Sequence, residues 1–359
     1  MPGGRRPVNP LEVAQTYCMN APGLREALGL PYGSTLELEP LAQGEHNANF
    51  LVRAEGDSRT FVLRINYSSQ MGLDDQIGYE YAALSALRDS GRTPRPLHVD
   101  GSKTVVDHGV LVEEYLPGDL LDLENEAQVE EAARVLADIH AVPVSTSCGL
   151  LRPSNQLQAQ LDTARGMIEN YKASAFAEPP VVQRVEGLFT QAQAALKARG
   201  ADDVVSTVST ASTAAAAPIV SVVNTEAVPS HFLFDTTGRG AMVDWEKPIL
   251  GNPAQDVAYF LSPTSTIWDS EVVFTAQQRE AFVDAYRTAV DGRFPLEAFD
   301  ADLPLFVMTN ALIGITWSCN AWIEYHDPSR PLQNEKTRAK LGIYRERTFL
   351  DVVERLCFR

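Results

Sequence analysis

The sequence predicts an α+β fold in which a small antiparallel β-sheet lobe precedes a larger, mainly helical lobe. Residues 35–65 alternate apolar and polar side chains in three runs, which is the period of half-buried strands. After about residue 115 the pattern changes to long runs with helical spacing. The chain has 359 residues, 45% of them hydrophobic, which is enough for one large domain or for two lobes with cores of their own.

The first predicted lobe spans residues 1–115. A short helical segment is expected over residues 11–29, before the sheet. Three strands follow, with Gly44 in the turn between the first two, and their sequences are TLELEPLAQ, NFLVRAEG and TFVLRIN. GYEYAALSALRDSG has helical spacing with a stop at Gly91. Two further strands, RPLHVDG and GVLVEEYL, complete a five-stranded lobe.

The second predicted lobe spans residues 116–359. Its expected helices are VEEAARVLADIHAV, QLQAQLDTARGMIENYKA, VVQRVEGLFTQAQAALKARG, QQREAFVDAYRTAV, PLFVMTNALIGITWSCNAWIEYH and TRAKLGIYRERTFLDVVERL. The Ser/Thr/Ala tract at 205–218 has low complexity and no period suited to a core. We therefore expect this tract to be a surface insertion without a chemical role.

Composition and charge narrow the class of protein. A formal net charge of −17 repels phosphate backbones, so a nucleic-acid partner is not expected. No long apolar run and no apolar segment after MPGGRRPVNP is present, so we expect neither a membrane span nor a signal peptide, and a cytoplasmic location. The four cysteines form no C-x-x-C pair and the six histidines lack zinc-ligand spacing, which favours reduced, buried thiols. None of these features sets the oligomeric state.

A few charged residues interrupt the apolar runs between residues 219 and 246. VNTEAVPSHFLFD contains Glu226 and His231, and MVDWEKP contains Asp244. An acid between AMV and a tryptophan is costly to bury unless it is ligated or paired. Phosphoryl transfer requires a cation on the phosphates, an acid that holds this cation, an acid near the acceptor hydroxyl and oxygen ligands for Mg²⁺. A two-lobed chain with these acids suits a nucleotide held between the lobes.

These motifs resemble the aminoglycoside phosphotransferase and choline kinase family, relatives of protein kinases, over about residues 38–290. The family's loop reads roughly H-G-D-x-x-x-x-N, followed by a strand and I-D-W-E. VNTEAVPSHFLFD followed by MVDWEKPILGNPAQDVAYFL keeps this frame without a gap. The resemblance implies a protein-kinase-like fold of two lobes. It also implies an ATP-dependent phosphotransferase for a hydroxyl of a small molecule, such as an aminoglycoside-like antibiotic, an amino alcohol or a sugar, with GTP as an alternative donor.

The resemblance implies roles for residues in both lobes. Glu226 matches the family's catalytic Asp, His231 its metal-binding Asn, Asn224 its His, and Asp244 its second metal ligand. The implied nucleotide-binding residues are Arg64, Glu80, Gly44, Asn47, Glu113 and Tyr115.

Each nucleotide-binding residue has a more specific expected role. Arg64 takes the place of the family's phosphate-binding Lys and pairs with Glu80, at a separation of 80 − 64 = 16. The backbone of QGEHNAN, which contains Gly44 and Asn47, would cover the phosphates. The segment LVEEYLPG, which contains Glu113 and Tyr115, would be the hinge whose backbone contacts the adenine. The alternatives for these segments are a hairpin turn and an ordinary strand before a Pro-Gly turn.

Three departures from the family affect the chemistry. Arg64 replaces the family's lysine and can hold phosphate bidentately. Glu226 replaces the family's aspartate and keeps a carboxylate, on a side chain that is one methylene longer. His231 is less suited to Mg²⁺ than to softer ions, so the site would use Mg²⁺ on Asp244 alone or Mn²⁺. Glu226 as a surface acid and His231 as a packing residue are the structural alternatives. A catalytically degenerate pseudokinase that binds nucleotide or acts as a scaffold, and transfer of AMP in place of phosphate, are the functional alternatives.

The acceptor is expected against a helix of the second lobe. FVMTNALIGITWSCNAWIEYH places Asn310, Trp317 and Glu324 at i, i+7 and i+14, close to one helical face. We expect these residues to line the acceptor pocket, although a buried helix with Trp317 as a packing residue fits equally well. Asp256 is expected to anchor the catalytic loop, and His140 to be a core histidine.

Overall fold

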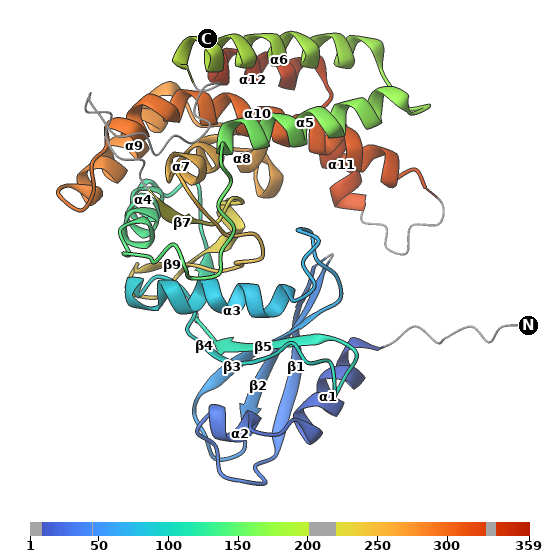
Figure 1. Cartoon of the computed structure of the whole chain (residues 1–359), viewed down its shortest axis with the longest axis vertical. Helices are drawn as coiled ribbons and strands as arrows, with labels where there is room; N and C mark the ends of the chain where they lie inside the picture. Colours follow the sequence, from blue (N-terminus) through green and yellow to red (C-terminus); the bar gives the residue numbers. More distant parts are fainter. Residues whose placement is uncertain (1–8, 45, 201–219, 328–334) are drawn as a thin grey trace, which may run out of the picture. The chain divides into compact units, whose positions relative to one another are not determined.

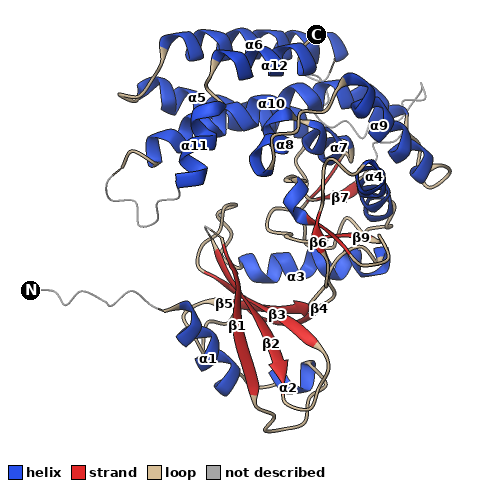
Figure 2. Cartoon of the chain, turned by 180° about the vertical axis from the view of Figure 1, so that it is seen from behind, coloured by secondary structure: helices blue, strands red, loops and turns tan. Residues whose placement is uncertain are grey.

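Helices and strands alternate at the start of the chain, and helices dominate the rest (Figure 1, Figure 2). The structure is a computed structural model that describes residues 9–44, 46–200, 220–327 and 335–359. The Ser/Thr/Ala tract predicted at 205–218 lies outside the described residues.

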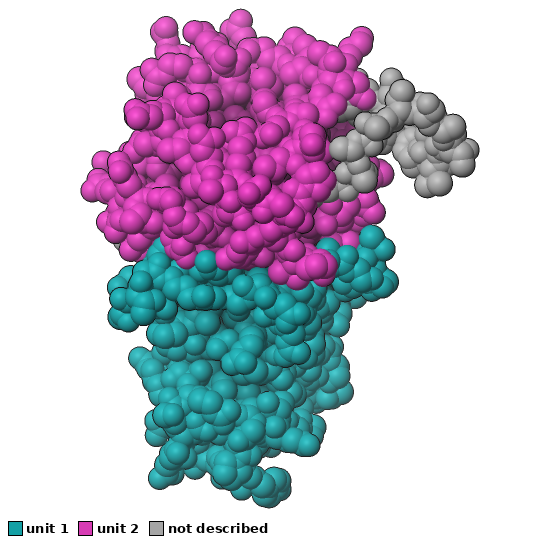
Figure 3. Space-filling model, turned by 90° about the vertical axis from the view of Figure 1, so that its left-hand side faces the viewer, with its two compact units in different colours: residues 1–119, 144–150, 233–248 teal, residues 120–143, 151–232, 249–359 magenta. Residues whose placement is uncertain are grey.

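The chain divides into two compact units, which Figure 3 distinguishes by colour. The first unit comprises Met1–Asp119, Val144–Leu150 and Leu233–Pro248, and the second comprises the three remaining stretches. The sequence pattern predicts a single lobe for all residues after 115. Here the stretch Leu233–Pro248, with Asp244, belongs to the first unit, because it makes its contacts there through tertiary interactions that local patterns do not reveal.

The first unit is built on an antiparallel sheet of five strands in the order β1-β2-β3-β5-β4. The five strands predicted from the sequence are therefore confirmed. The elements of this part of the chain are α1 (Pro10–Asn20), α2 (Leu24–Ala27), β1 (Leu36–Gln43), β2 (Asn47–Ala54), β3 (Thr60–Asn66), α3 (Gln76–Leu87), the 3-10 turn η1 (Arg88–Ser90), β4 (Pro96–Asp100) and β5 (Gly109–Glu114). The short lead-in predicted over residues 11–29 is also helical, in two pieces.

Helices make up most of the remaining chain. Its elements are β6 (Asp119–Leu120), α4 (Glu126–His140), α5 (Gln156–Ala173), α6 (Pro179–Arg199), β7 (Ser221–Val223), η3 (Pro229–His231), β8 (Phe232–Phe234), β9 (Gly240–Met242), β10 (Ile249–Gly251), α7 (Ala254–Leu261), α8 (Pro263–Asp269), α9 (Ala276–Val290), α10 (Glu297–Glu324), α11 (Glu335–Ile343) and α12 (Arg347–Cys357). Strand β10 pairs with β7, and β6, β8 and β9 form a three-stranded sheet. The last predicted helical run is two helices, α11 and α12, separated at residues 344–346.

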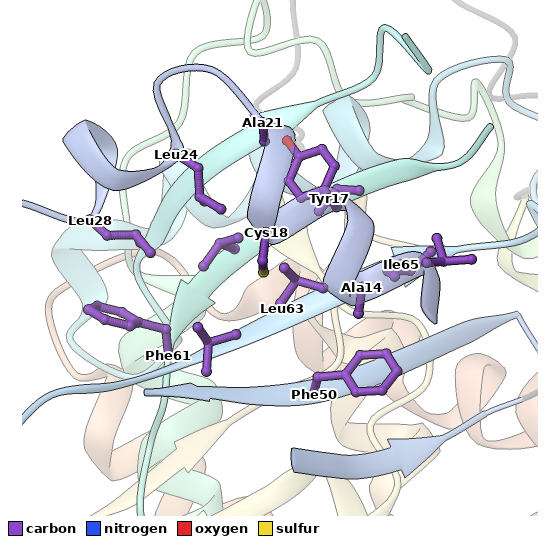
Figure 4. Close-up of a cluster of buried hydrophobic side chains, with 14 of the residues drawn as sticks. Ala14, Tyr17, Cys18, Ala21, Leu24, Leu28, Phe50, Phe61, Leu63 and Ile65 are labelled. Atoms are coloured by element: carbon purple, nitrogen blue, oxygen red, sulfur yellow. The ribbon is translucent and has the colours of Figure 1, made fainter. Parts of the chain in front are cut away.

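Side chains on β3 alternate between a hydrophobic face and a polar face of the five-stranded sheet. Leu63 and Ile65 are fully buried in a hydrophobic cluster with Phe50 of β2 and with Ala14 and Tyr17 of α1 (Figure 4). Successive residues of a strand point to opposite faces, so the residue between Leu63 and Ile65 faces away from this core. That residue is Arg64, which the family resemblance implies to be a phosphate ligand.

Helix α3 is held by its N-terminal cap. Asp75 accepts a hydrogen bond from the Gly78 backbone N–H at 3.0 Å, which satisfies one of the helix's free donors. The helix packs on β4 and β5 and carries Glu80, which is buried, in its second turn.

Helix α10 is the longest element of the second unit and contacts α5, α6, α7 and α8. Gly314 permits close contact with α8, because a Cβ at this position would lie 2.3 Å from Thr264 Oγ1. Among the described residues, α10 is the one helix whose length and composition would suffice to cross a membrane. This is weak support for a span, since apolar core helices meet the same criteria.

Candidate functional site

Arg64 is the centre of a charged cluster in the first unit. It occupies β3 between Asn49 of β2 and Leu111 of β5, on the face opposite the hydrophobic core, and its residue is 6% exposed. Its Nη1 lies 3.3 Å from Glu80 Oε2, which is the ion pair that the family resemblance implies. The same nitrogen lies 3.1 Å from Asp244 Oδ1 and 3.3 Å from Glu246 Oε1.

Asp244 lies in the loop after β9, in a constrained backbone conformation. Its φ is 63°, a left-handed conformation that residues other than glycine rarely adopt. The loop is fixed on both sides, because the Met242 backbone N–H donates to Arg92 O at 2.7 Å and Trp245 Nε1 donates to Met242 O at 3.1 Å. Such strain is characteristic of positions where the surrounding structure holds a side chain for function.

Glu246 links the cluster to β2 and α3. Its Oε1 accepts a hydrogen bond from Asn47 Nδ2, and its backbone carbonyl accepts one from Gln76 Nε2 at 2.7 Å. Gln76 also donates to Glu80 Oε1 at 3.0 Å. The predicted nucleotide-binding residue Asn47 is therefore part of this cluster, and it accepts a bond from Asn66 Nδ2 at 2.8 Å.

Acidic groups outnumber basic groups around Arg64. Burial raises the pKa of Glu80 to about 8, against the opposing effect of Arg64, and raises that of Glu113 to about 7. Burial alone would lower the pKa of Arg64, but the carboxylates around it outweigh this effect and raise the pKa. The arginine thus stays charged, and a further cation would be favourable beside it.

One N–H group of Arg64 makes no hydrogen bond within this cluster. Its Nε is buried and has no hydrogen-bond partner among the described residues. Asn49 Oδ1, on the neighbouring strand, is also buried without a partner in that part of the chain. A buried donor without an acceptor is costly, so the geometry around Arg64 fits an additional anionic ligand such as a phosphate oxygen.

The other predicted nucleotide-binding residues lie at the ends of strands. Gly44 lies in the turn between β1 and β2, where its backbone N–H donates to Asn47 O at 2.9 Å. Glu113 is buried within β5, and Tyr115 follows the end of that strand. Their contacts with a nucleotide stay a prediction.

The Glu226 loop of the second unit is held by Asp256 at the start of α7. The Asn224 backbone N–H donates to Asp256 Oδ2 at 2.7 Å, and the Thr225 N–H donates to Oδ1 at 2.8 Å. Asn224 Oδ1 in turn accepts the Glu226 N–H at 3.1 Å, so an amide braces the loop where the family has a histidine. Thr225 has a φ of 72°, and the residue before the predicted base is therefore also in the left-handed region.

His140 completes the support of this loop. Its Nε2 lies 3.2 Å from Asp256 Oδ2 and its Nδ1 lies 2.9 Å from Tyr286 Oη, and all three residues are buried. Burial, with the charge of Asp256 as the second cause, holds the pKa of Tyr286 well above its usual value, so its hydroxyl stays protonated. Asp256 and His140 thus have the anchoring and core positions expected from the sequence.

The two remaining predicted residues of the catalytic loop, Glu226 and His231, are both partly exposed. His231 ends the 3-10 turn η3 and is partly exposed. Glu226 is partly exposed as well, and its charge adds to the effect of burial in raising the pKa of Tyr259. The catalytic role of Glu226 and the metal role of His231 stay predictions.

The three residues predicted to line the acceptor pocket become more exposed along α10. Asn310 is 1% exposed, donates to Gln255 O at 2.9 Å and accepts from Gln160 Nε2 at 2.8 Å, so both ends of its amide have partners. Trp317 is 37% exposed and meets Trp268 edge to face at 5.2 Å. Glu324 is exposed and accepts a bond from Asn320 Nδ2 at 3.1 Å. An acceptor would therefore find Trp317 and Glu324 more accessible than Asn310.

A divalent metal would need ligands from outside the protein. Within the described ranges, no group of three or more His, Cys, Asp or Glu side chains is arranged to hold an ion. The side chain of Asp244 is 34% exposed, so its carboxylate is accessible. Mg²⁺ usually keeps waters and combines one or two carboxylates with phosphate oxygens, and Asp244 fits this mode.

Sequence reasoning missed two members of the cluster. Glu246 and Gln76 were given no role, although Glu246 connects β2, β3 and α3. The signal for Glu246 was its place two residues after Asp244 in the same polar interruption of an apolar run. Gln76 had no such signal, because its importance depends on where α3 packs.

The sequence matches a known family over most of its length. A sequence model of the phosphotransferase enzyme family matches residues 37–299. No curated protein sequence matches the chain significantly.

Solved structures share the fold at low sequence identity. A Ralstonia eutropha protein named as an aminoglycoside phosphotransferase has a TM-score of 0.67 and 14% identity, with 97% of this chain and 98% of the other covered. A spectinomycin phosphotransferase in complex with ADP and spectinomycin has a TM-score of 0.63 and 10% identity, covering 97% and 98%. The choline kinase LicA from Streptococcus pneumoniae has a TM-score of 0.57 and 16% identity, covering 92% and 98%. The protein-kinase-like α+β fold predicted from the sequence is thus confirmed.

Proposed function

Because the chain belongs to the phosphotransferase enzyme family, we propose that it transfers the terminal phosphoryl group of ATP to a hydroxyl of a small molecule. The observation that carries this proposal is the buried, charged guanidinium of Arg64 with its unused Nε donor. In a chain with a net charge of −17, a buried arginine with a free donor is suited to bind a nucleotide phosphate.

The residues proposed to bind the nucleotide belong to the first unit. Arg64 would donate to a phosphate oxygen while Glu80 keeps its guanidinium in place. Asp244 would ligate Mg²⁺ or Mn²⁺, an ion that would offset charge on the transferring group. The surplus of carboxylates over arginine in the cluster favours the arrival of such a cation.

The residues proposed to act on the acceptor belong to the second unit. Glu226 would accept the proton of the acceptor hydroxyl, since the Asp256 anchor and the Asn224 amide fix the backbone that carries it. Trp317 and Glu324 would face the acceptor. An exposed acid and a partly exposed indole on the same helix suit an acceptor that bears an amine, such as an aminoglycoside or an amino alcohol.

A pseudokinase that binds nucleotide without turnover is the second candidate. The observation that favours it is the ion pair between Arg64 and Asp244, which engages the predicted metal ligand with an internal cation. In that case ATP would bind and raise the melting temperature, but no acceptor would support metal-dependent release of ADP.

A screen of hydroxylated acceptors separates the two candidates. The protein is incubated with ATP, with Mg²⁺ or Mn²⁺, and with aminoglycosides, amino alcohols and sugars, and the products are analysed by mass spectrometry. An acceptor that gains one phosphate, with equimolar ADP, supports the proposed function. Stabilisation by ATP without product supports the pseudokinase, and release of pyrophosphate would show AMP transfer.

The acceptor residues are tested with the substrate that the screen identifies. Glu324→Ala should raise the KM for an amine-bearing acceptor with little change in the KM for ATP. Unchanged kinetics would remove Glu324 from the acceptor pocket. Glu280→Ala, an exposed glutamate of α9, is the matched control.

A further inference from the structure

A cavity of about 310 Å³ lies within the first unit, and its lining includes Glu114, Leu116 and Pro117 of the predicted hinge segment but neither Glu113 nor Tyr115. Three stretches line it, namely the loop after α3, the end of β5 and the hairpin between β8 and β9. The charged and hydroxyl-bearing residues of the lining are Arg88, Thr93, Arg95, Glu114, Asp235 and Arg239.

The cavity and the Arg64 cluster lie on opposite faces of β5. Glu113 pairs with Val62 in the sheet and its carboxyl lies within the electrostatic influence of Arg64. Glu114, the next residue, lines the cavity and forms an ion pair with Arg95 at 3.0 Å. Adjacent residues of a strand point to opposite faces, so a ligand of the cavity would not contact Arg64.

The charge around the cavity is positive, in contrast to the chain as a whole. Three arginines and two acids line it, which leaves one net positive charge where the chain has −17. Both acids already have partners, because Glu114 pairs with Arg95 and Asp235 accepts bonds from the backbone N–H groups of Thr237 and Arg239.

Two of the arginines have donors to spare. Arg88 is exposed and has no ion pair among the described residues. Arg239 donates from Nη2 to Gly91 O at 2.8 Å, and a guanidinium has five N–H donors. These two side chains can therefore bind an anion without giving up a bond to the protein.

A buried hydroxyl in the lining has no partner either. Thr93 is 6% exposed, and its Oγ1 has no hydrogen-bond partner in the described chain. Leaving a buried polar atom unsatisfied is unfavourable, so such atoms in native structures usually face a ligand or an ordered water. The Thr93 hydroxyl can donate to an anion bound in the cavity.

We propose that this cavity binds a small phosphomonoester through its phosphate group, with Arg88, Arg239 and Thr93 as ligands. A water takes about 30 Å³ of liquid volume, so the cavity has room for a phosphate together with a small organic part. Arginine and hydroxyl donors are the groups that bind phosphate oxygens in proteins. The proposal does not depend on phosphotransferase activity, because no lining residue has a proposed part in phosphoryl transfer, although three of them belong to the predicted hinge segment.

Isothermal titration with glycerol 3-phosphate tests the proposal, in parallel with inorganic phosphate and at constant ionic strength. The titrations are run on the full chain with and without saturating AMP-PNP and Mg²⁺. We expect binding that is unchanged by AMP-PNP. A higher affinity for glycerol 3-phosphate than for phosphate would assign the site to a phosphomonoester, and equal affinities would assign it to inorganic phosphate. No binding of either probe, or binding that AMP-PNP abolishes, would overturn the proposal.

Two variants locate the binding site. Arg88→Gln should weaken binding about tenfold, the effect of one charge-assisted hydrogen bond. Thr93→Val should weaken binding severalfold while the melting temperature stays the same or rises, because the removed hydroxyl has no protein partner. Arg53→Gln, an exposed arginine of β2 paired with Glu39, is the control and should bind normally. Equal effects of Arg53→Gln and Arg88→Gln would show only nonspecific attraction and contradict the proposal.

Discussion

Arg64 Nη1 lies 3.1 Å from Asp244 Oδ1, so the proposed phosphate ligand and the proposed metal ligand form an ion pair with each other. Arg64 lies in β3 and Asp244 in the loop after β9, 180 residues further along the chain. A phosphate and its cation could replace this pair, because the phosphate would bind the arginine and the cation the aspartate.

Arg64 should be important for stability as well as for nucleotide binding. Arg64→Met leaves buried carboxylates without their cation, and we expect it to lower the free energy of unfolding by about 3–5 kcal/mol. Arg64→Lys introduces the lysine that is usual in the family and keeps the positive charge. It should lower the free energy of unfolding by less than half as much as Arg64→Met. Denaturant unfolding at pH 7 measures both, with Arg53→Met in an exposed ion pair as a control that should cost at most about 1 kcal/mol. Equal losses for Arg64→Met and Arg53→Met would contradict the central position of Arg64.

The buried acids around Arg64 predict that stability falls with rising pH. The pKa values of Glu80 and Glu113 are raised in the folded protein, to about 8 and about 7, so the folded state binds more protons than the unfolded state above pH 4.5. Their contribution is therefore complete below about pH 4.5 and is lost as the pH rises through these folded pKa values.

Glu113→Gln isolates this effect, because an amide cannot ionise. Between pH 5 and pH 8 the wild type should lose more unfolding free energy than Glu113→Gln. Denaturant unfolding at several pH values, without nucleotide or metal, measures the difference. Parallel pH profiles for the two proteins would show that Glu113 is ionised throughout this range in the folded state.

Asp256 should determine the stability of the loop that carries Glu226. Asp256→Ala removes the carboxylate that accepts hydrogen bonds from the N–H groups of Asn224 and Thr225, and we expect a loss of about 3 kcal/mol in unfolding free energy. Asp256→Asn keeps one acceptor and should lose less. Turnover should fall in the same order at temperatures where both variants are folded. An Asp256→Ala protein with normal stability would show that these bonds do not hold the loop.

Two glycines should respond to alanine in opposite directions. At Gly118 a Cβ would lie 2.7 Å from Phe234 O, so Gly118→Ala must displace backbone and should destabilise the protein by about 2 kcal/mol. At Gly166, inside α5, a Cβ has no neighbour within 4 Å, so Gly166→Ala should stabilise the protein by about 1 kcal/mol. Melting curves of the two variants measure the contrast, and a destabilising Gly166→Ala would contradict the described packing of α5.

The sequence predicted the parts of the fold that depend on local pattern. The five strands, α3 and the long helices follow from periodicity, and the family resemblance implied the ion pair between Arg64 and Glu80. The split between α11 and α12 and the attachment of residues 233–248 to the first unit could not be predicted, because tertiary contacts determine them.

The candidate site could be predicted in outline. Asp244 was identified because an acid in an apolar run needs a partner, and the structure provides Arg64 as that partner. The contributions of Gln76 and of the Glu246 backbone carbonyl depend on the packing of α3, which leaves no local signature. The left-handed conformation of Asp244 and Thr225 could not be predicted from the sequence either, since neither residue is a glycine.

Phosphate transfer by Glu226→Gln shows whether Glu226 is the general base of the proposed reaction. The measurement is incorporation of labelled phosphate from γ-labelled ATP into the acceptor, with ATP binding followed by calorimetry in the same protein. The account predicts that Glu226→Gln loses at least about a hundredfold in kcat, the usual contribution of a general base, while it binds ATP normally and Glu280→Gln keeps full activity. A Glu226→Gln protein that transfers phosphate at the wild-type rate would contradict the account.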